Sequence, residues 1–269
     1  MKKYFKHGKL LALALSVGLA VSSLPVIASI KHHPRTQSSP DVSENLMALR
    51  FKVRRVRYSR RRTGGLSRGS KECNGDLVSV TPLWPNSGSE EEKTQTEVES
   101  TVDSNPTFFV HLSHESTQEA EFLLLKEQDG NQEQIIHEEI LELTSNPTGN
   151  SRILALSLPS DGEKQLEVGK YYHWMFSVMC DEEDSSKNVV VDGWVQRIPP
   201  DTDNLETELA QTEPRNHPDI YAERGIWPDT LMVLANLRQQ YPNDVQLKEK
   251  WETLLKSVGL DEAIATQTP

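Results

Sequence analysis

Two histidines and a glutamate lie in the stretch HLSHE at residues 111–115, and these are residue types that bind zinc. Zinc proteases arrange them as H-E-x-x-H or H-x-x-E-H, and this stretch has neither order. The surrounding residues indicate a strand, on which residues three apart point to opposite faces. We therefore expect no metal ion at His111 and His114, and no cofactor.

Four consecutive acids, Asp181 to Asp184, have the chemistry of calcium ligands and of glycosidase catalytic groups. A calcium loop needs spaced acids, a central glycine and a terminal glutamate, which this run lacks, so we expect a solvated turn. A glycosidase needs two carboxyl groups about 5–10 Å apart. Asp181, Glu183 and Asp192 are the candidates if the protein is a hydrolase of envelope or extracellular polysaccharide.

Trp194 lies beside Asp192 and Gln196, on the face of its strand opposite a row of valines. An exposed tryptophan on a sheet can stack on a sugar ring. The interpretation that we favour is that the C-terminal helices cover it, because they need an apolar platform. The sequence contains no glycine-rich phosphate loop and no serine nucleophile motif. We predict no catalytic residues and a protein that is not an enzyme.

The N-terminus has the pattern of a secretory signal peptide over residues 1–28. A basic start, MKKYFKHGK, precedes an apolar run that ends near Leu24, and small residues follow. Cleavage between Ala28 and Ser29 fits this pattern. The alternative is an uncleaved membrane anchor over Leu10–Ile30, which its serines and Pro25 disfavour. We expect an exported protein, periplasmic or extracellular, with no membrane span after cleavage.

The two cysteines, Cys73 and Cys180, are the only ones in the chain. Export places them in an oxidising compartment, where an even number of cysteines favours disulfide formation. A Cys73–Cys180 disulfide is the prediction, and two buried free thiols are the alternative.

Charge divides the chain into a basic segment and an acidic body. Ten basic residues and no acid lie in residues 50–71, whereas residues 72–269 contain 13 Lys and Arg against 38 Asp and Glu. We expect residues 29–72 to be a flexible arm. Its arginines could contact a polyanion such as acidic polysaccharide or lipid headgroups, although a plain linker is the more common role of such charge blocks. The arginines concerned are Arg54, Arg55, Arg57, Arg60, Arg61 and Arg62. Export argues against nucleic acid.

Residues 73–200 have the pattern of a β-domain with about seven short strands separated by turn residues. The expected strands are Leu77–Trp84, Thr107–Leu112, Ala120–Lys126, Gln134–Leu143, Arg152–Leu158, residues 171–180 and Asn188–Ile198. The fold class is mainly β with an α appendix.

The stretch LEVGKYYHWMFSVMC, residues 166–180, carries the clearest alternation. Its even positions from Tyr172 to Cys180 are the apolar set, so they are expected to face the core. Leu166 and Tyr172 have the spacing of a tyrosine corner, in which the tyrosine hydroxyl bonds to backbone a few residues upstream. This spacing favours an immunoglobulin or fibronectin III-like β-sandwich.

Residues 201–269 change to a helical period and predict a C-terminal helical hairpin packed on the sandwich. The first helix begins near Pro228, and Pro242 ends it. Asn243 or Asp244 begins the second, and Gly259 ends it. The expected buried residues are Trp227, Leu231, Leu234, Leu237, Tyr241, Leu247, Trp251, Leu254 and Val258.

Residues 73–260 resemble a family of exported cyanobacterial proteins known as Domain of Unknown Function 928. The stretches that carry the resemblance are GDLVSVTPLWPNSG, NPTFFVHLS, LEVGKYYHWMFSVMC, VDGWVQRI, YAERGIWPDTLMVLANLR and WETLLKSVGL. Many members look to have an aromatic residue where this chain has Pro228, which puts the start of that helix in doubt. The resemblance implies export and both cysteines in place, and it implies no activity.

These observations together favour a non-enzymatic binding or assembly module of the cell envelope or extracellular space. Its expected partner is an envelope or extracellular protein or an acidic polysaccharide. The polysaccharide hydrolase described above is the alternative.

Overall fold

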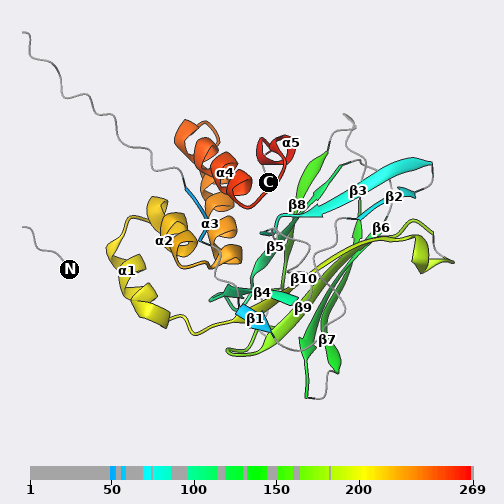
Figure 1. Ribbon diagram of the computed structural model, residues 1–269, viewed down its shortest axis with the longest axis horizontal. Helices are drawn as coiled ribbons and strands as arrows, with labels where there is room; N and C mark the ends of the chain where they lie inside the picture. The colour runs from blue at the N-terminus through cyan, green and yellow to red at the C-terminus, as the bar shows by residue number, and fades with distance from the viewer. Residues whose placement is uncertain are drawn as a thin grey trace, which may run out of the picture. The chain divides into compact units, whose positions relative to one another are not determined.

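The alternating stretches of the acidic body form two β-sheets in the computed structural model of the protein (Figure 1). The structure describes residues 49–52, 56–58, 69–73, 75–85, 96–113, 119–129, 132–143, 151–159, 164–181 and 183–267, with the backbone alone for 56–58 and 96. The strands are β1 Val56–Tyr58, β2 Gly69–Cys73, β3 Asp76–Pro82, β4 Thr96–Thr101, β5 Thr107–Leu112, β6 Glu119–Glu127, β7 Glu133–Glu142, β8 Arg152–Ser157, β9 Tyr171–Val178 and β10 Val189–Arg197.

One sheet has six strands in the order β1-β4-β10-β9-β6-β7, and the other has four in the order β2-β3-β5-β8. Strands β4 and β10 are parallel, and the other pairs are antiparallel. The described residues therefore contain ten strands where the sequence predicted about seven. The additional ones are β1, β2 and β4, which lie in stretches with more charge than apolar residues.

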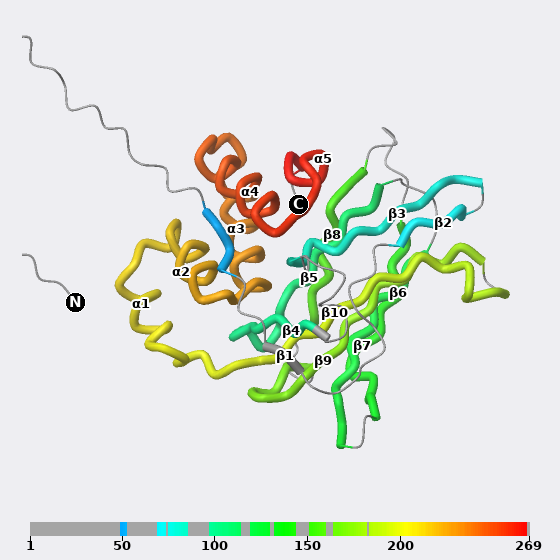
Figure 2. The backbone as a smooth tube through the Cα atoms, in the orientation of Figure 1, coloured from blue at the N-terminus to red at the C-terminus, as the bar shows by residue number. Residues whose placement is uncertain are grey.

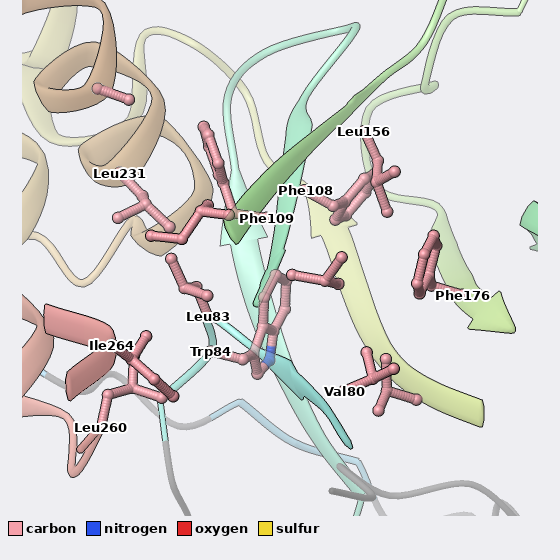
Figure 3. Close-up of a cluster of buried hydrophobic side chains, with 14 of the residues drawn as sticks. Val80, Leu83, Trp84, Phe108, Phe109, Leu156, Phe176, Leu231, Leu260 and Ile264 are labelled. Carbon is pink, nitrogen blue, oxygen red and sulfur yellow. The ribbon is translucent and has the colours of Figure 1, made fainter. Parts of the chain in front are cut away.

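The inner faces of the two sheets meet in an aromatic core. Tyr172, Trp174 and Phe176 of β9 are fully buried, as their alternation predicts. The ring centroid of Phe108, from the four-stranded sheet, lies 5.3 Å from that of Trp174 and 5.8 Å from that of Phe122. Figure 3 shows Phe108 and Phe176 in this cluster with Val80 and Leu156. Such contacts add to the stabilisation that burial of apolar area supplies.

Gly193 lets the largest of these side chains fit. It lies opposite Trp174 in the β9–β10 pairing. A Cβ at this position would come within 2.7 Å of the indole Nε1 and 2.9 Å of two ring carbons. The glycine is therefore required for close approach of the indole to the backbone of β10.

Residues 205–265 contain five α-helices where the sequence predicted a hairpin of two. They are α1 Leu205–Gln211, α2 His217–Glu223, α3 Trp227–Gln240, α4 Val245–Ser257 and α5 Glu262–Ala265. Short 3₁₀ turns lie between β9 and β10 (η2 Ser185–Lys187), before α1 (η3 Thr202–Asn204) and before α2 (η4 Pro214–Asn216). Pro228 is in the first turn of α3, which proline tolerates. Asp244 caps α4 by accepting hydrogen bonds from the N–H groups of Gln246 and Leu247. Tyr241 is 45% exposed, so its expected burial was wrong.

The helices lie beside β4 and β5 and share the core of the sheets (Figure 1). The indole N–H of Trp227 donates a hydrogen bond to the carbonyl of Leu83 at 2.8 Å. In Figure 3, Leu231 lies beside Phe109, and Ile264 lies near Leu83. Because Phe109 follows Phe108 on the strand, it points to the outer face of the four-stranded sheet. The helices therefore cover that face.

Parts of the segment predicted as a flexible arm belong to the folded unit. The side chain of Phe51 is buried, with its ring centroid 4.8 Å from that of Trp227, and the N–H of Lys52 donates to the carbonyl of Ala222 at 3.0 Å. Figure 2 shows this piece of chain against the helices. Strands β1 and β2 join one sheet each. The β-domain thus begins before the expected boundary at residue 73.

Candidate functional site

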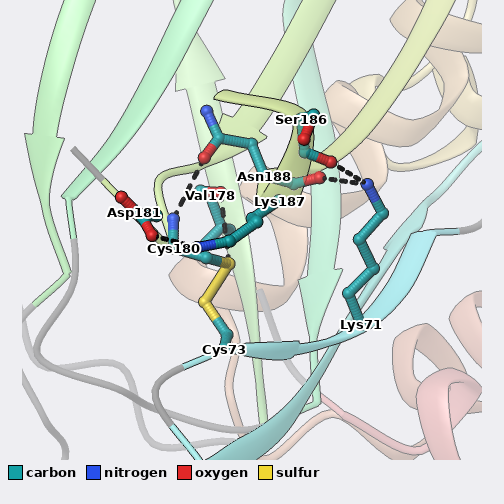
Figure 4. Close-up of a disulfide and its surroundings, with 8 residues drawn as sticks. All are labelled: Lys71, Cys73, Val178, Cys180, Asp181, Ser186, Lys187 and Asn188. Atoms are coloured by element: carbon teal, nitrogen blue, oxygen red, sulfur yellow. Dashed lines mark hydrogen bonds and ion pairs between the residues drawn. A yellow bond between two sulfur atoms is a disulfide. The ribbon is translucent and has the colours of Figure 1, made fainter. Parts of the chain in front are cut away.

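The predicted disulfide is present and connects the two sheets (Figure 4). Cys73 is the last residue of β2, and Cys180 lies two residues after β9 ends. Both cysteines are buried. The bridge spans a sequence separation of 107 residues, which includes β3 to β9.

The acidic run after Cys180 forms an ordered turn. Asp181 accepts hydrogen bonds from the N–H groups of Glu183 and Asp184, and its carboxylate pairs with Lys187. The Lys187 ammonium is the main reason that the pKa of Asp181 is lowered. Asn188 closes the turn by accepting a hydrogen bond from the N–H of Cys180 at 3.1 Å. These acids thus organise the β9–β10 connection.

The hydrolase candidates have separate partners. Asp192 lies on β10 and is buried, with its Oδ2 atom 2.8 Å from Nε2 of His173. Asp181 is engaged with Lys187, and Glu183 is exposed in the same turn. The structure therefore assigns Asp181 and Asp192 to different local networks rather than to one shared partner.

His173, Asp192 and Trp194 form a cluster on the outer face of the six-stranded sheet. The His173 and Trp194 rings stack, with their centroids 4.4 Å apart and an interplanar angle of 7°. Nδ1 of His173 lies 3.3 Å from the carboxylate of Glu133 on β7. Sequence reasoning placed Asp192 beside Trp194 but did not connect His173 to them, because His173 lies on the neighbouring strand.

Trp194 is covered, and the ring that stacks on it belongs to His173 of β9 rather than to a C-terminal helix. The helices contact β4 and β5 and cover the outer face of the other sheet. Because the Trp194 indole and the His173 imidazole that stacks on it are both buried, Trp194 lacks the exposed ring face that stacking on a sugar requires.

Tyr172 is fully buried, and its hydroxyl accepts a hydrogen bond from the N–H of Glu167 at 2.7 Å. Burial raises the pKa of this phenol. Leu166 is also buried, and its carbonyl accepts a hydrogen bond from Arg197 at 2.6 Å. Tyr172 and Arg197 therefore fix the turn that leads into β9.

Replacing Tyr172 by phenylalanine is expected to lower the free energy of unfolding by about 1–3 kcal/mol, because the N–H of Glu167 loses its acceptor. Chemical denaturation measures the change. Tyr241→Phe is the matched control, since this tyrosine is half exposed, and its effect should stay within about 0.5 kcal/mol. Equal effects of the two changes would contradict a structural role of the Tyr172 hydroxyl.

His111 lies in β5 and is buried, with its Nε2 atom 3.1 Å from the amide nitrogen of Gln267. Burial lowers its pKa. His114 lies outside the described residues. In the part of the chain that the structure describes, no group of three or more His, Cys, Asp or Glu could hold a metal ion.

Among the candidate polyanion contacts, only Arg57 is in a described strand, at the centre of β1. Arg54, Arg55, Arg60, Arg61 and Arg62 lie outside the described residues, as do Ala28, Ser29 and the whole signal-like segment. None of the described helices is long and apolar enough to cross a membrane.

Asp229 is a buried carboxyl between helix α3 and the six-stranded sheet. Its Oδ2 atom accepts a hydrogen bond from the hydroxyl of Thr101 on β4 at 2.7 Å. Desolvation raises the pKa of Asp229 to about 7, and the charge of Asp103 acts in the same direction. No sequence pattern marked this residue, because an aspartate in a first helical turn is usually exposed.

Strand β7 forms one edge of the six-stranded sheet. It is ten residues long and, among the described strands, pairs only with β6. Ile135 and Ile140 are 53% and 48% exposed. A long edge strand with exposed apolar side chains is a natural place for another chain to pair. We take this edge as the candidate interaction site.

Comparison with curated proteins found no match to this chain. A family model does match, over residues 63–269, which includes both cysteines, the Tyr172 turn and all five α-helices. The chain therefore belongs to the family described as Domain of Unknown Function (DUF928).

Proposed function

We propose that the protein is an exported binding or assembly module of the cell envelope or extracellular space, and that it is not an enzyme. The observation that carries this proposal is the open edge of β7, where Ile135 and Ile140 are about half exposed. Exposed apolar side chains on an unpaired strand edge invite aggregation unless a partner uses them.

Two structural features support export and the type of module. The buried disulfide is of the kind that persists in oxidising compartments. The strand order β10-β9-β6-β7 corresponds to G-F-C-C′ of immunoglobulin-like sandwiches, and β3-β5-β8 corresponds to A-B-E. In those sandwiches a tyrosine on strand F bonds to backbone upstream, as Tyr172 does on β9. We therefore propose an immunoglobulin-like sandwich, a scaffold that commonly presents binding surfaces.

The basic segment adds a second proposed contact, with an acidic polysaccharide. Ten basic residues without an acid in residues 50–71 would attract a polyanion, and such attraction weakens with salt. Because Phe51 and Lys52 are anchored on the helices, deletion of the whole segment would disturb the fold. Substitution of Arg60, Arg61 and Arg62 by glutamine tests this contact and leaves Phe51 and Lys52 in place.

Co-sedimentation of the mature chain with envelope fragments from its source cells tests the proposed function. We expect the protein to sediment with the fragments, to form discrete crosslinked products and to release no soluble sugar. The triple glutamine variant should lose only the salt-sensitive part of the binding. Failure to sediment together with release of sugar would overturn the proposal in favour of the hydrolase.

A further inference from the structure

We propose that the edge of β7 binds an extended peptide segment whose side chains on one face alternate between basic and apolar, and that this segment pairs with β7 as an additional strand. The inference rests on the proposed binding function and specifies the surface and the chemistry of the partner. Addition of a strand to an open sheet edge uses main-chain hydrogen bonds for affinity and alternate side chains for specificity.

The register of β7 against β6 determines which side chains a partner would meet. Phe122 and Leu124 of β6 point into the core, so Glu121, Leu123 and Leu125 point to the outer face. Their partners on β7 are Ile140, Glu138 and Ile135, with a register shift between Leu124 and Leu125. The outer row of β7 therefore consists of Glu133, Ile135, Glu138, Ile140 and Glu142.

This outer row alternates between carboxylates and isoleucines. A strand added to it would place its own outward side chains directly opposite, where opposite charges or pairs of apolar groups stabilise the pairing. With lysine or arginine opposite each glutamate and an apolar residue opposite each isoleucine, every side chain of the outer row gains a complementary partner. The partner is thus expected to alternate basic and apolar residues on this face.

The charge of the hairpin favours a cationic partner. Glu142 lies directly opposite Glu119 on β6, and Glu121 lies opposite Ile140. Like charges directly opposite each other destabilise a strand pair. A cation added beside Glu142 would relieve this repulsion, which an apolar or acidic partner would not do.

The same charges argue against pairing between two copies of β7. Antiparallel pairing that brings Ile135 opposite Ile140 of a second copy would also bring Glu133 opposite Glu142. The register shifted by two residues would place each of these isoleucines opposite a glutamate and so would pair no apolar side chains. Such like-charge pairs are a device by which natural edge strands avoid self-association. A separate basic segment is therefore the occupant that fits.

Binding of the acetylated and amidated octapeptide KTVTKTVT to the disulfide-bonded mature protein tests the proposal, because its lysines and valines alternate along one face of a strand. We expect saturable binding and slowed amide hydrogen exchange in residues 133–142, because the added strand engages the N–H groups that point away from β6. The control peptide, KTKTVTVT, has the same composition with the lysines and the valines of that face in two blocks, and it should bind at least tenfold more weakly. Equal binding of both peptides, or unchanged exchange in β7, would overturn the proposal.

Two lysine substitutions locate the site. Glu138→Lys and Ile140→Lys should each weaken octapeptide binding about tenfold or more. Both side chains are exposed, and a lysine at position 140 would face Glu121, so the fold is preserved. Leu77→Lys is the matched control, because Leu77 is 68% exposed on β3 of the other sheet, and it should leave binding unchanged.

Two further outcomes separate this inference from the proposed function. If the β7 variants fail to bind the octapeptide but sediment with envelope fragments as wild type does, the partner uses another surface and the inference is wrong while the function stands. If the free protein is a dimer that Ile140→Lys converts to a monomer, the occupant is a second copy and the inference is also wrong. Loss of both peptide binding and specific crosslinks in the β7 variants supports it.

Discussion

Replacing both cysteines by alanine is expected to lower the free energy of unfolding by about 2–5 kcal/mol, the usual effect of removing a disulfide that closes a long loop. Cys73 and Cys180 are 107 positions apart, so the bridge restricts most of the unfolded β-domain. Alanine is preferred to serine because both sites are buried and would not accommodate a hydroxyl without cost. Urea denaturation should show a lower midpoint and a steeper slope, since the unfolded chain becomes more expanded.

The loss of stability after removal of the disulfide should be greatest at β2. This strand is at the edge of the four-stranded sheet, and the disulfide ends it. Lys71 also holds β2 by donating hydrogen bonds to the carbonyls of Ser186 and Asn188 at 2.8 and 2.9 Å (Figure 4). Lys71→Ala is therefore the matched control, with an expected loss of about 1 kcal/mol or less. An unchanged free energy of unfolding in the double alanine variant would show that the bridge does not restrain the unfolded chain.

The parts of the fold that sequence reasoning recovered are those with strong periodicity. Tyr172, Trp174 and Phe176 alternate with more polar residues, and burial of one face is the simplest way to satisfy that pattern. In the same way, Leu247, Trp251 and Leu254 share one face of α4 and are buried. A disulfide followed from compartment and number, because two cysteines allow one intramolecular pairing.

Strand β4 shows why other elements were missed. Its sequence, TEVEST, has one strongly apolar residue and two glutamates, and this composition predicts an acidic loop. It is a strand because β10 and β1 pair with it on either side, and such pairing between distant segments leaves no local pattern. Helices α1 and α2 were missed for a related reason: each has only seven residues, too few for a helical period to stand out.

The candidate site was even less accessible from sequence. Ile135 and Ile140 are five residues apart, which would place them on opposite faces of a regular strand. The register shift in the β6–β7 pairing puts both on the outer face. Only the register therefore reveals the alternation of glutamate and isoleucine along β7.

The contribution of Asp229 to the free energy of unfolding is expected to fall as the pH rises from about 4 to about 7, and Asp229→Asn should remove this contribution to the pH dependence. Burial raises the pKa of Asp229 from 3.8 to about 7 in the folded protein. The folded state therefore binds this proton more tightly than the unfolded state does. Stability from this group is fully present below pH 3.8, declines between the two pKa values and is constant above the folded pKa.

The direction of the pKa shift of Asp229 results from opposing interactions of different strength. The hydroxyl of Thr101 and the N–H of Val102 stabilise the carboxylate, and the N-terminus of α3 also favours a negative charge. Desolvation outweighs them because the side chain is enclosed between α3 and β4, and the nearby charge of Asp103 adds to it. A neutral carboxyl or amide avoids the cost of burying the charge while keeping a polar group beside Thr101.

The measurement is the free energy of unfolding of wild type and Asp229→Asn at several pH values from 4 to 8. The difference between them should move in favour of the variant by up to about 4 kcal/mol over this range, since one pKa unit corresponds to about 1.4 kcal/mol. Any constant offset from the altered hydrogen bonds cancels in this comparison. Glu249→Gln changes an exposed side chain on α4, and its free energy of unfolding should vary with pH as that of wild type does. Parallel curves for Asp229→Asn as well would mean that Asp229 titrates normally and that its carboxylate is stabilised where it lies.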